Sequence, residues 1–308
     1  MPNSIRYHII QNAISTPRIE TYRKFFDEHS TEEIYGIYLW NKTLCGAIYP
    51  LLQACEVALR NAINTPAVER FGPYWHEAIS HTLHRGNDNY NYTNLVGNFE
   101  RARDNVVKKL NKQLRSNDRP PLRRDFKPDF NLVVAATDFS TWEYALHTCH
   151  YRVNNNNYLW PKQTKKSFKN WPHQSSSDTQ IELYNIVSEL RPFRNRLSHH
   201  EPLWKGISVT TEEEALAYVN QKIDKIESLI AIISDEKAKY LNVQNLLVKA
   251  RYTASKDMLD RCRYRSKGQQ FSLKRKNKLR AFLRELSASN TPKIIEFGGA
   301  KFLIEALK

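Results

Sequence analysis

Glycine, cysteine and long apolar runs are all scarce in this sequence. Of 308 residues, 9 are glycine, 13 are proline and 4 are cysteine. Folds built on many Gly and Pro turns, such as β-sandwiches and barrels, are therefore disfavoured. The cysteines stand far apart with no CxxC pair, which is typical of buried thiols and not of a zinc or disulfide framework. They are Cys45, Cys55, Cys149 and Cys262.

Membrane, nucleotide and metal signals are also missing. The longest apolar runs, such as Leu229–Ile233, are far shorter than the roughly 20 residues of a membrane span. Residues 1–6 lack the apolar core of a signal peptide, so we expect a cytoplasmic protein with no membrane partner. No GxxxxGK[ST] or GxGxxG motif occurs. The grouping of His147, Cys149 and His150 fits no common zinc site, so we expect neither metal nor cofactor.

Positive charge is concentrated at the C-terminal end. Residues 237–308 hold 18 Lys and Arg against 5 Asp and Glu, whereas the preceding residues are nearly balanced. A basic segment interleaved with aromatic residues favours RNA, because cations neutralise phosphates and rings stack on bases. The alternatives are a solvated basic tail or a membrane-surface segment. The candidate RNA-binding residues are Arg261, Arg263, Tyr264, Arg265, Lys267, Lys274, Arg275 and Lys276.

Apolar periodicity predicts helices almost throughout the chain. One helix is expected from Thr31 to just before Pro66, with a kink or restart at Pro50. Further helices are predicted over 99–114 and 132–146, and loops over 86–97, 117–130 and 154–172.

The two clearest helices lie in the second half of the chain. Ser177 and Gln180 have capping-box spacing and predict a helix that is kinked at Pro192 and ends before Pro202. A second capping box begins at Thr211, before an apolar seam over 216–233 that suits burial in a bundle better than self-association. The seam also permits a protein–protein adaptor. We predict an all-α fold, with a helical domain over 1–240 and a basic helical extension over 241–308.

The densest chemistry lies over 191–202, at the end of the first of these helices. Arg191, Asn195 and His199 recur every four residues and share a face. Arg194 and His199 are five residues apart, or about 140° around an ideal helix. They converge only if the helix kinks or if a second copy of the chain supplies the partner residue. A simpler interpretation is a helix C-terminus whose carbonyls attract cations, with one histidine buried and hydrogen-bonded.

These residue types suit RNA cleavage without metal. Histidine can move the proton of a 2′-hydroxyl near neutral pH, and arginine can hold a phosphate and stabilise charge in the transition state. The products would be a 2′,3′-cyclic phosphate and a 5′-hydroxyl. Spacing alone is weak, because Arg followed by His five to seven residues later occurs four times in this sequence. A non-catalytic RNA clamp with the same residues remains the alternative.

The segment RNRLSHHEP resembles the Arg-Asn-x-x-x-His motif of HEPN ribonucleases, and more narrowly the Abi-like (AbiD/AbiF-type) bacterial proteins. The segments YLWNKTLCGAIYPLLQACEVALRNAI, YLWPK and RPFRNRLSHHEPLW agree in order, over roughly residues 20–240. The resemblance implies a HEPN-like helical bundle, an active site often assembled in a homodimer, and an RNA-targeting toxin of phage defence. It also implies a small non-coding RNA as partner, as in toxin–antitoxin pairs.

The same resemblance implies roles for individual residues. By motif match, Arg194 binds phosphate, His199 is catalytic and Asn195 orients. The motif is extended, with less defined roles, by Arg196, His200 and Glu201.

A second polar cluster comprises Glu56, Arg60 and Asn61. Glu56 and Arg60 are spaced for a surface ion pair worth about 0.3–0.5 kcal/mol. Alternatively, this polar face packs against the motif helix, where Glu56 would orient His199 or Arg194.

Overall fold

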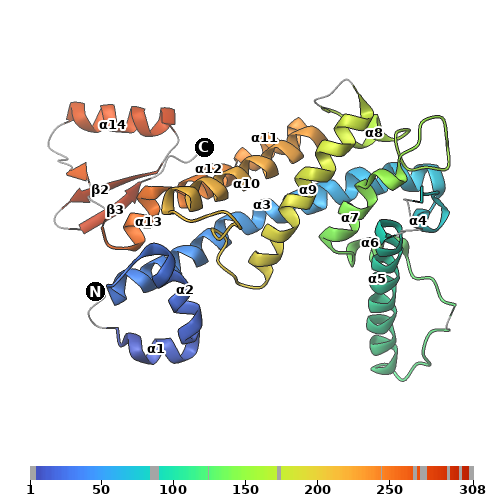
Figure 1. Cartoon of the computed structure of the whole chain (residues 1–308), viewed down its shortest axis with the longest axis horizontal. Coiled ribbons are helices and arrows are strands. Elements are labelled where there is room, and N and C mark those ends of the chain that lie inside the picture. The colour runs from blue at the N-terminus through green and yellow to red at the C-terminus, as the bar shows by residue number, and fades with distance from the viewer. Residues whose placement is uncertain are drawn as a thin grey trace. The chain divides into compact units, whose positions relative to one another are not determined.

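The computed structural model describes residues 5–83, 90–123, 125–171, 175–243, 245–265, 269–270, 276–289, 292–297 and 300–304. They are mostly helical, which confirms the all-α prediction (Figure 1). The first helices are α1 (Tyr7–Ile14), α2 (Thr16–Phe26), α3 (Thr31–Phe71), α4 (Trp75–Ala78), α5 (Tyr90–Arg115), α6 (Phe130–Ala135) and α7 (Phe139–Leu146). They are followed by α8 (Thr164–Ser167), α9 (Ser176–Ser198), α10 (Glu212–Ile233), α11 (Asp235–Val243), α12 (Leu246–Thr253), α13 (Lys256–Cys262) and α14 (Lys276–Ser289). Within the described residues, no helix is both long and apolar enough to cross a bilayer.

The chain forms two compact units. One comprises Met1–Leu52, Asn195–Glu227 and Ala238–Lys308, and the other comprises Gln53–Arg194 and Ser228–Lys237. We call them the first and the second unit. Their boundaries fall inside α3, α9, α10 and α11, so these helices contribute residues to both units. The domain division expected at residue 240 stays a prediction.

The long helix α3 shows where tertiary packing overrides a local signal. It continues through Pro50 and Pro66 to Phe71, so the expected end before Pro66 is wrong. An internal proline costs about 3 kcal/mol, but burial of the following turn offsets it. Ala67 is fully buried, and Arg70 donates hydrogen bonds to carbonyls of the 156–159 loop.

The first unit is organised around buried tryptophans. The rings of Tyr22 and Phe26 meet Trp204 edge-on at 5.6 and 5.0 Å between centroids. Nε1 of Trp40 donates to the carbonyl of Thr253 at 2.8 Å and so ties α3 to the end of α12. Helices α3 and α13 also approach closely, because a Cβ on Gly36 would overlap the carbonyl oxygen of Cys262. Only glycine fits there without displacing the backbone.

The capping box predicted at the start of α10 is confirmed. The backbone nitrogen of Glu214 donates to Oγ1 of Thr211, and the carboxylate of Glu214 accepts from the nitrogen of Thr211, both at 3.2 Å. The apolar seam is buried inside the chain, with Val219, Ile223 and Ile226 fully covered. Burial within the bundle therefore explains the seam.

The second unit differs from the sequence-based expectation at two places. The Asn-rich segment expected to be a loop over 86–97 is helical from Tyr90, where α5 begins, nine residues earlier than predicted. The helix predicted over 132–146 is split into α6 and α7, because Asp138 caps a new helix by accepting from the nitrogen of Thr141 at 3.2 Å. Asp129 caps α6 in the same way.

The C-terminal end is not purely helical, contrary to prediction. Strand β2 (Lys293–Phe297) pairs in parallel with β1 (Gln269–Gln270) and antiparallel with β3 (Ala300–Ile304). Helix α14 supplies Phe282 and Leu286 to a small core with Ile295 of β2. The Ile294–Ile295 pair is β-branched and favours a strand once a helix covers one face.

Candidate functional site

Helix α9 carries the motif predicted from sequence. Its N-terminus is capped by Ser175, whose Oγ accepts from the nitrogens of Ser177 and Asp178 at 3.2 and 3.4 Å. The capping box expected at Ser177 is therefore wrong. Gln180 instead donates to the carbonyls of Leu146 and His147 at the end of α7. The helix is unbroken through Pro192 and buries Leu183, Ile186, Val187, Leu190, Phe193 and Leu197.

The C-terminus of α9 ends in a Schellman motif. His200 is in the left-handed region at φ 58° and donates its nitrogen to the carbonyl of Leu197 at 3.1 Å. The nitrogen of Glu201 donates to the carbonyl of Arg196 at 2.8 Å. Glycine usually occupies the position of His200, because other residues are strained there. The stop predicted before Pro202 is confirmed.

This cap places both histidines at the surface. His199 and His200 are exposed, so the interpretation of a buried, hydrogen-bonded histidine does not hold. The nitrogen of His199 still donates to the carbonyl of Asn195 at 2.9 Å, which continues the helical ladder. The imidazoles therefore project from an ordered helix end. Asn195 and Arg196 are half-buried on the preceding turn, and Glu201 is exposed.

The segment after the histidines is anchored within the first unit. Nη1 of Arg18 donates to the carbonyl of His200 at 3.1 Å. The nitrogen of Leu203 donates to Oδ1 of the buried Asn41 at 3.0 Å. Together with the burial of Trp204, these bonds hold the turn that carries His199 and His200.

Arg194 lies in the second unit beside the cluster predicted from α3. Its Nε is 3.7 Å from Oε2 of Glu56, whose side chain is 21% exposed. Burial raises the pKa of Glu56, and the nearby charges of Arg194 and Arg60 oppose that rise. No ion pair joins Glu56 to Arg60 among the described residues, and Asn61 is exposed. Of the two interpretations of this cluster, the geometry matches a carboxylate that faces the motif arginine.

Arg191, the third arginine of the cluster, is engaged elsewhere. Its Nη1 donates to Oε2 of Glu143 at 3.0 Å and to the hydroxyl of Tyr144 at 3.3 Å. The Glu143 side chain is 8% exposed, so its carboxylate is largely desolvated. Sequence reasoning missed Glu143. A single carboxylate within the apolar stretch FSTWEYAL was the available signal, because a buried charge requires a partner.

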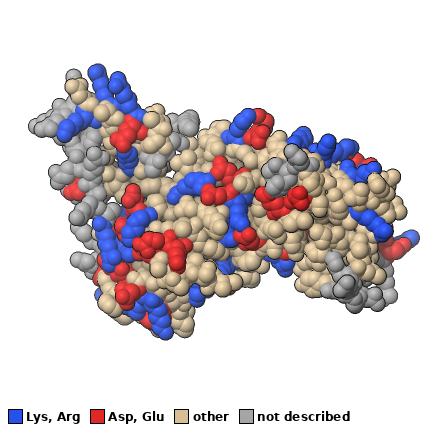
Figure 2. All heavy atoms as spheres, turned by 45° about the horizontal axis from the view of Figure 1, so that its top comes forward, with Lys and Arg blue, Asp and Glu red and all other residues tan. Residues whose placement is uncertain are grey.

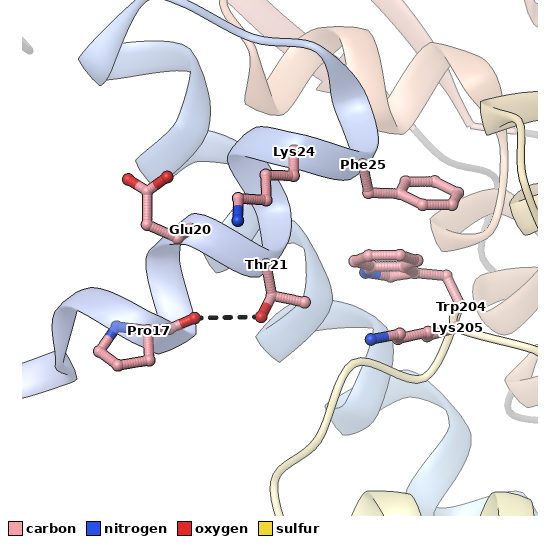
Figure 3. A pocket seen from close by; sticks show the side chains of 7 residues that line it. All are labelled: Pro17, Glu20, Thr21, Lys24, Phe25, Trp204 and Lys205. Carbon is pink, nitrogen blue, oxygen red and sulfur yellow. Dashed lines mark hydrogen bonds between the residues drawn. The ribbon is translucent and has the colours of Figure 1, made fainter.

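A cavity of about 470 Å³ opens beside the anchored segment (Figure 3). In Figure 3 the indole of Trp204 lies next to the Phe25 ring, and its nitrogen points to the side on which Lys24 lies. Nε1 of Trp204 is buried and has no hydrogen-bond partner among the described residues. The cavity is lined by Pro17, Glu20, Thr21, Lys24, Phe25, Trp204 and Lys205. Sequence reasoning did not identify it, since α2 and the 204–205 segment meet only in the fold.

The predicted RNA-binding arginines of the C-terminal segment are largely engaged in ion pairs. Arg263 is 3% exposed, pairs with Glu212 and has Nη1 3.7 Å from Glu28. Arg265 bridges Glu28 and Glu33 at 2.7 and 2.5 Å. Arg261 and Tyr264 are exposed.

The other candidates of that segment are not placed. Lys267, Lys274 and Arg275 lie outside the described residues, as does the side chain of Lys276. Figure 2 shows basic and acidic atoms interspersed over one face of the molecule, with Lys and Arg atoms projecting at the upper left, in the region of α14.

Two histidines outside the motif, His76 and His150, are buried. His150 is fully buried, and burial lowers its pKa to about 3. His76 is stacked on Phe99 at 4.0 Å, and burial lowers its pKa to about 4. In the described part of the chain, no three His, Cys, Asp or Glu side chains converge on one point as metal ligands would.

Comparison with known proteins adds a family. No curated protein and no solved structure matches the chain. The family model described as Abi-like protein matches residues 5–205, which is more than half of the chain. The match includes Glu56, the whole α9 motif and the cavity beside it. The chain therefore belongs to the Abi-like protein family, which is associated with abortive-infection defence against phage.

Proposed function

We propose that this protein is a HEPN-type, metal-independent endoribonuclease that acts as a toxin in abortive infection. The observation that carries the proposal is the exposed His199–His200 pair on a capped and anchored helix end, directly after Arg194 and Asn195. A histidine that is open to solvent can reach an RNA backbone, which a buried one could not.

The proposed reaction is an internal transfer within RNA. His199 removes the proton of a 2′-hydroxyl, whose oxygen attacks the adjacent phosphorus. The bond to the 5′-oxygen breaks, and that oxygen takes a proton from a second histidine. The products are a 2′,3′-cyclic phosphate and a 5′-hydroxyl, with no water consumed. Arg194 would stabilise the charge on the phosphoryl oxygens, and Glu56 would hold its guanidinium in place.

A homodimer would complete this site. Positions five apart on a helix point about 140° away from one another, so Arg194 and His199 of one chain do not face one phosphate. A two-fold axis would bring the arginine of one copy towards the histidine of the other. A small non-coding RNA bound by the dimer would keep the site occupied until phage infection removes it.

The cavity beside α9 supports RNA as the ligand. The half-buried ring of Phe25 and the ammonium groups of Lys24 and Lys205 in its lining suit a base with its phosphate. The turn that carries His200 is bonded to Arg18, next to Pro17 in the cavity wall. A nucleotide held there would flank the scissile bond.

The test compares two histidine variants on a labelled structured RNA. His199→Ala is expected to abolish cleavage while RNA binding remains. The matched control is His29→Ala, because His29 is also exposed and also follows an arginine, Arg23, at a similar spacing. The control should cleave at the wild-type rate, and end mapping should show cyclic phosphates.

Two outcomes would contradict the proposal. Cleavage by His199→Ala at the wild-type rate would remove His199 from the reaction. RNA binding without cleavage by the wild-type dimer, after release of any co-purified RNA, would favour the non-catalytic clamp.

A further inference from the structure

We propose that the C-terminal half of α5 and the segment that follows it form the main surface for RNA phosphates. This surface, residues 103–123, is called the α5 arm below. The inference rests on the proposed function only in taking RNA as the ligand, and it does not depend on cleavage.

The α5 arm extends beyond the part of α5 that packs within its unit. The buried residues of α5 are Leu95, Asn98, Phe99 and Ala102, and no residue after Ala102 is buried. In Figure 1 the first half of α5 lies against α6 and α7, whereas the second half reaches away from them. Thirteen helical residues follow Ala102, a length of about 20 Å. So much uncovered helix indicates a surface used for contact with a partner.

The arm is nevertheless ordered by contacts of its own. The nitrogen of Leu122 donates to Oδ1 of Asn111 at 2.8 Å, and the nitrogen of Arg119 donates to the carbonyl of Leu114 at 2.9 Å. These bonds bring the segment after α5 back along the helix. Val106, Val107, Leu110, Leu114 and Leu122 are half-buried. The cations are therefore carried by the helix together with the segment that folds back along it, and not by a single isolated helix.

Most cations of the arm have no acidic partner in the described chain. Six exposed Lys and Arg form no ion pair there, whereas Asp104 pairs with Arg103 at 3.5 Å. Lys108, Lys112 and Arg115 follow one another at four and three residues and share a face. The six are Lys108, Lys109, Lys112, Arg115, Arg119 and Arg123.

The composition of the arm indicates how it would bind. It contains no aromatic residue, so base stacking is not available there. Lysines and arginines without stacking partners contact the phosphate backbone, which is the same in every RNA sequence. The arm would therefore supply affinity that depends on salt and not on sequence, while the α9 motif selects the bond to be cut.

The experiment measures the dissociation constant of a fluorescent RNA hairpin over a series of salt concentrations. All proteins carry His199→Ala, so the result is independent of cleavage. The arm variant is Lys108→Gln, Lys112→Gln and Arg115→Gln. The matched control, Lys278→Gln, Arg280→Gln and Arg284→Gln, removes three exposed cations from α14.

The arm variant is expected to bind at least about tenfold more weakly, and the slope of log affinity against log salt should fall by about 2 to 3. The control should change affinity less than about twofold, and a hairpin of scrambled sequence should behave like the first.

Three outcomes would overturn the inference. One is equal loss of affinity in both variants. Another is loss of dimerisation in the arm variant, by light scattering, with RNA affinity unchanged. The last is that the parent protein binds anionic phosphatidylserine vesicles and the arm variant does not, while both bind RNA with the same affinity. Failure of the wild-type protein to cleave RNA would leave the inference intact, since only binding is measured.

Discussion

Two regions of this protein are rich in Lys and Arg, and Arg263 and Arg265 of the one have surroundings opposite to those of the α5 arm in the other. In the C-terminal segment, Arg263 and Arg265 are held by Glu28, Glu33 and Glu212 within the first unit. In the α5 arm of the second unit, six cations are exposed and have no ion pair in the described chain. A run of basic residues therefore says little about a partner until its acidic neighbours in space are known.

The difference comes from contacts that are remote in sequence. Arg265 lies more than two hundred residues after the two glutamates that bind it. Folding has placed an acidic cluster opposite the C-terminal arginines, and buried pairs of this kind fix how segments dock. The six unpaired cations of the arm have no such counterpart among the described residues, so their charge stays exposed to solvent.

The largest effect is expected where a buried cation loses its carboxylate. Glu212→Ala should destabilise the first unit by about 3 kcal/mol, because it leaves Arg263 in a site that is 3% exposed without its nearest partner. Urea unfolding measures the change. Glu213→Ala, at the exposed neighbouring position, should cost less than about 0.5 kcal/mol. Equal effects of the two substitutions would mean that the C-terminal arginines are not structural.

The next effect concerns the docking of α13 on α3. Gly36→Ala should cost about 2 to 3 kcal/mol, because the new methyl group overlaps the carbonyl of Cys262. The matched control is Gly46→Ala on the same helix, where the added Cβ meets nothing within 4 Å. That control should raise the unfolding free energy by about 0.5–1 kcal/mol, since alanine favours helix. Opposite signs in thermal unfolding would verify the contact, and like signs would argue against it.

A smaller effect on stability is expected from His76, which stacks on Phe99 of α5. The pKa of His76 is lowered to about 4, mainly by burial, so the unfolded chain binds more protons than the folded one between pH 6.5 and that value. Stability is therefore lost as the pH falls below 6.5, by about 1 kcal/mol per pH unit. Denaturant titrations at several pH values would measure this slope, and His76→Phe should make it shallower. His150 adds a similar dependence.

The smallest effect on stability is expected at the cations of the arm. Replacing Lys108, Lys112 and Arg115 with glutamine should change the unfolding free energy by less than about 0.5 kcal/mol, because they are exposed and have no ion pair to lose. Calorimetry measures this change. A loss of several kcal/mol would show that the arm cations are structural after all, and the contrast between the two regions would disappear.

The sequence predicted features whose causes are local. The capping box of Thr211 and Glu214 and the buried seam of α10 were correct, since both depend on spacing within one helix. The end of α3 was wrong, because the cost of Pro66 is offset by contacts with a loop ninety residues away. The split between α6 and α7 was missed although Asp138 was visible, since an apolar pattern on both sides concealed it.

The features of the candidate site likewise fall into those that local sequence predicts and those that it does not. The motif of α9 and its stop at Pro202 could be read from the sequence, and so could the polar face of α3 that carries Glu56. The partner of Arg191, the cavity under Trp204 and the ion pairs of Arg263 could not, since each joins segments distant in the chain.

The backbone of His200 has a consequence for variant selection. A non-glycine residue in the left-handed region costs about 1 kcal/mol or more, which glycine would avoid. Folding alone therefore favours His200→Gly, even though it deletes an exposed imidazole next to His199. A library sorted only for heat resistance should enrich that substitution, while one sorted for killing of the host cell should deplete it. The ratio between the two selections would report how much stability this protein gives up for an imidazole at this turn.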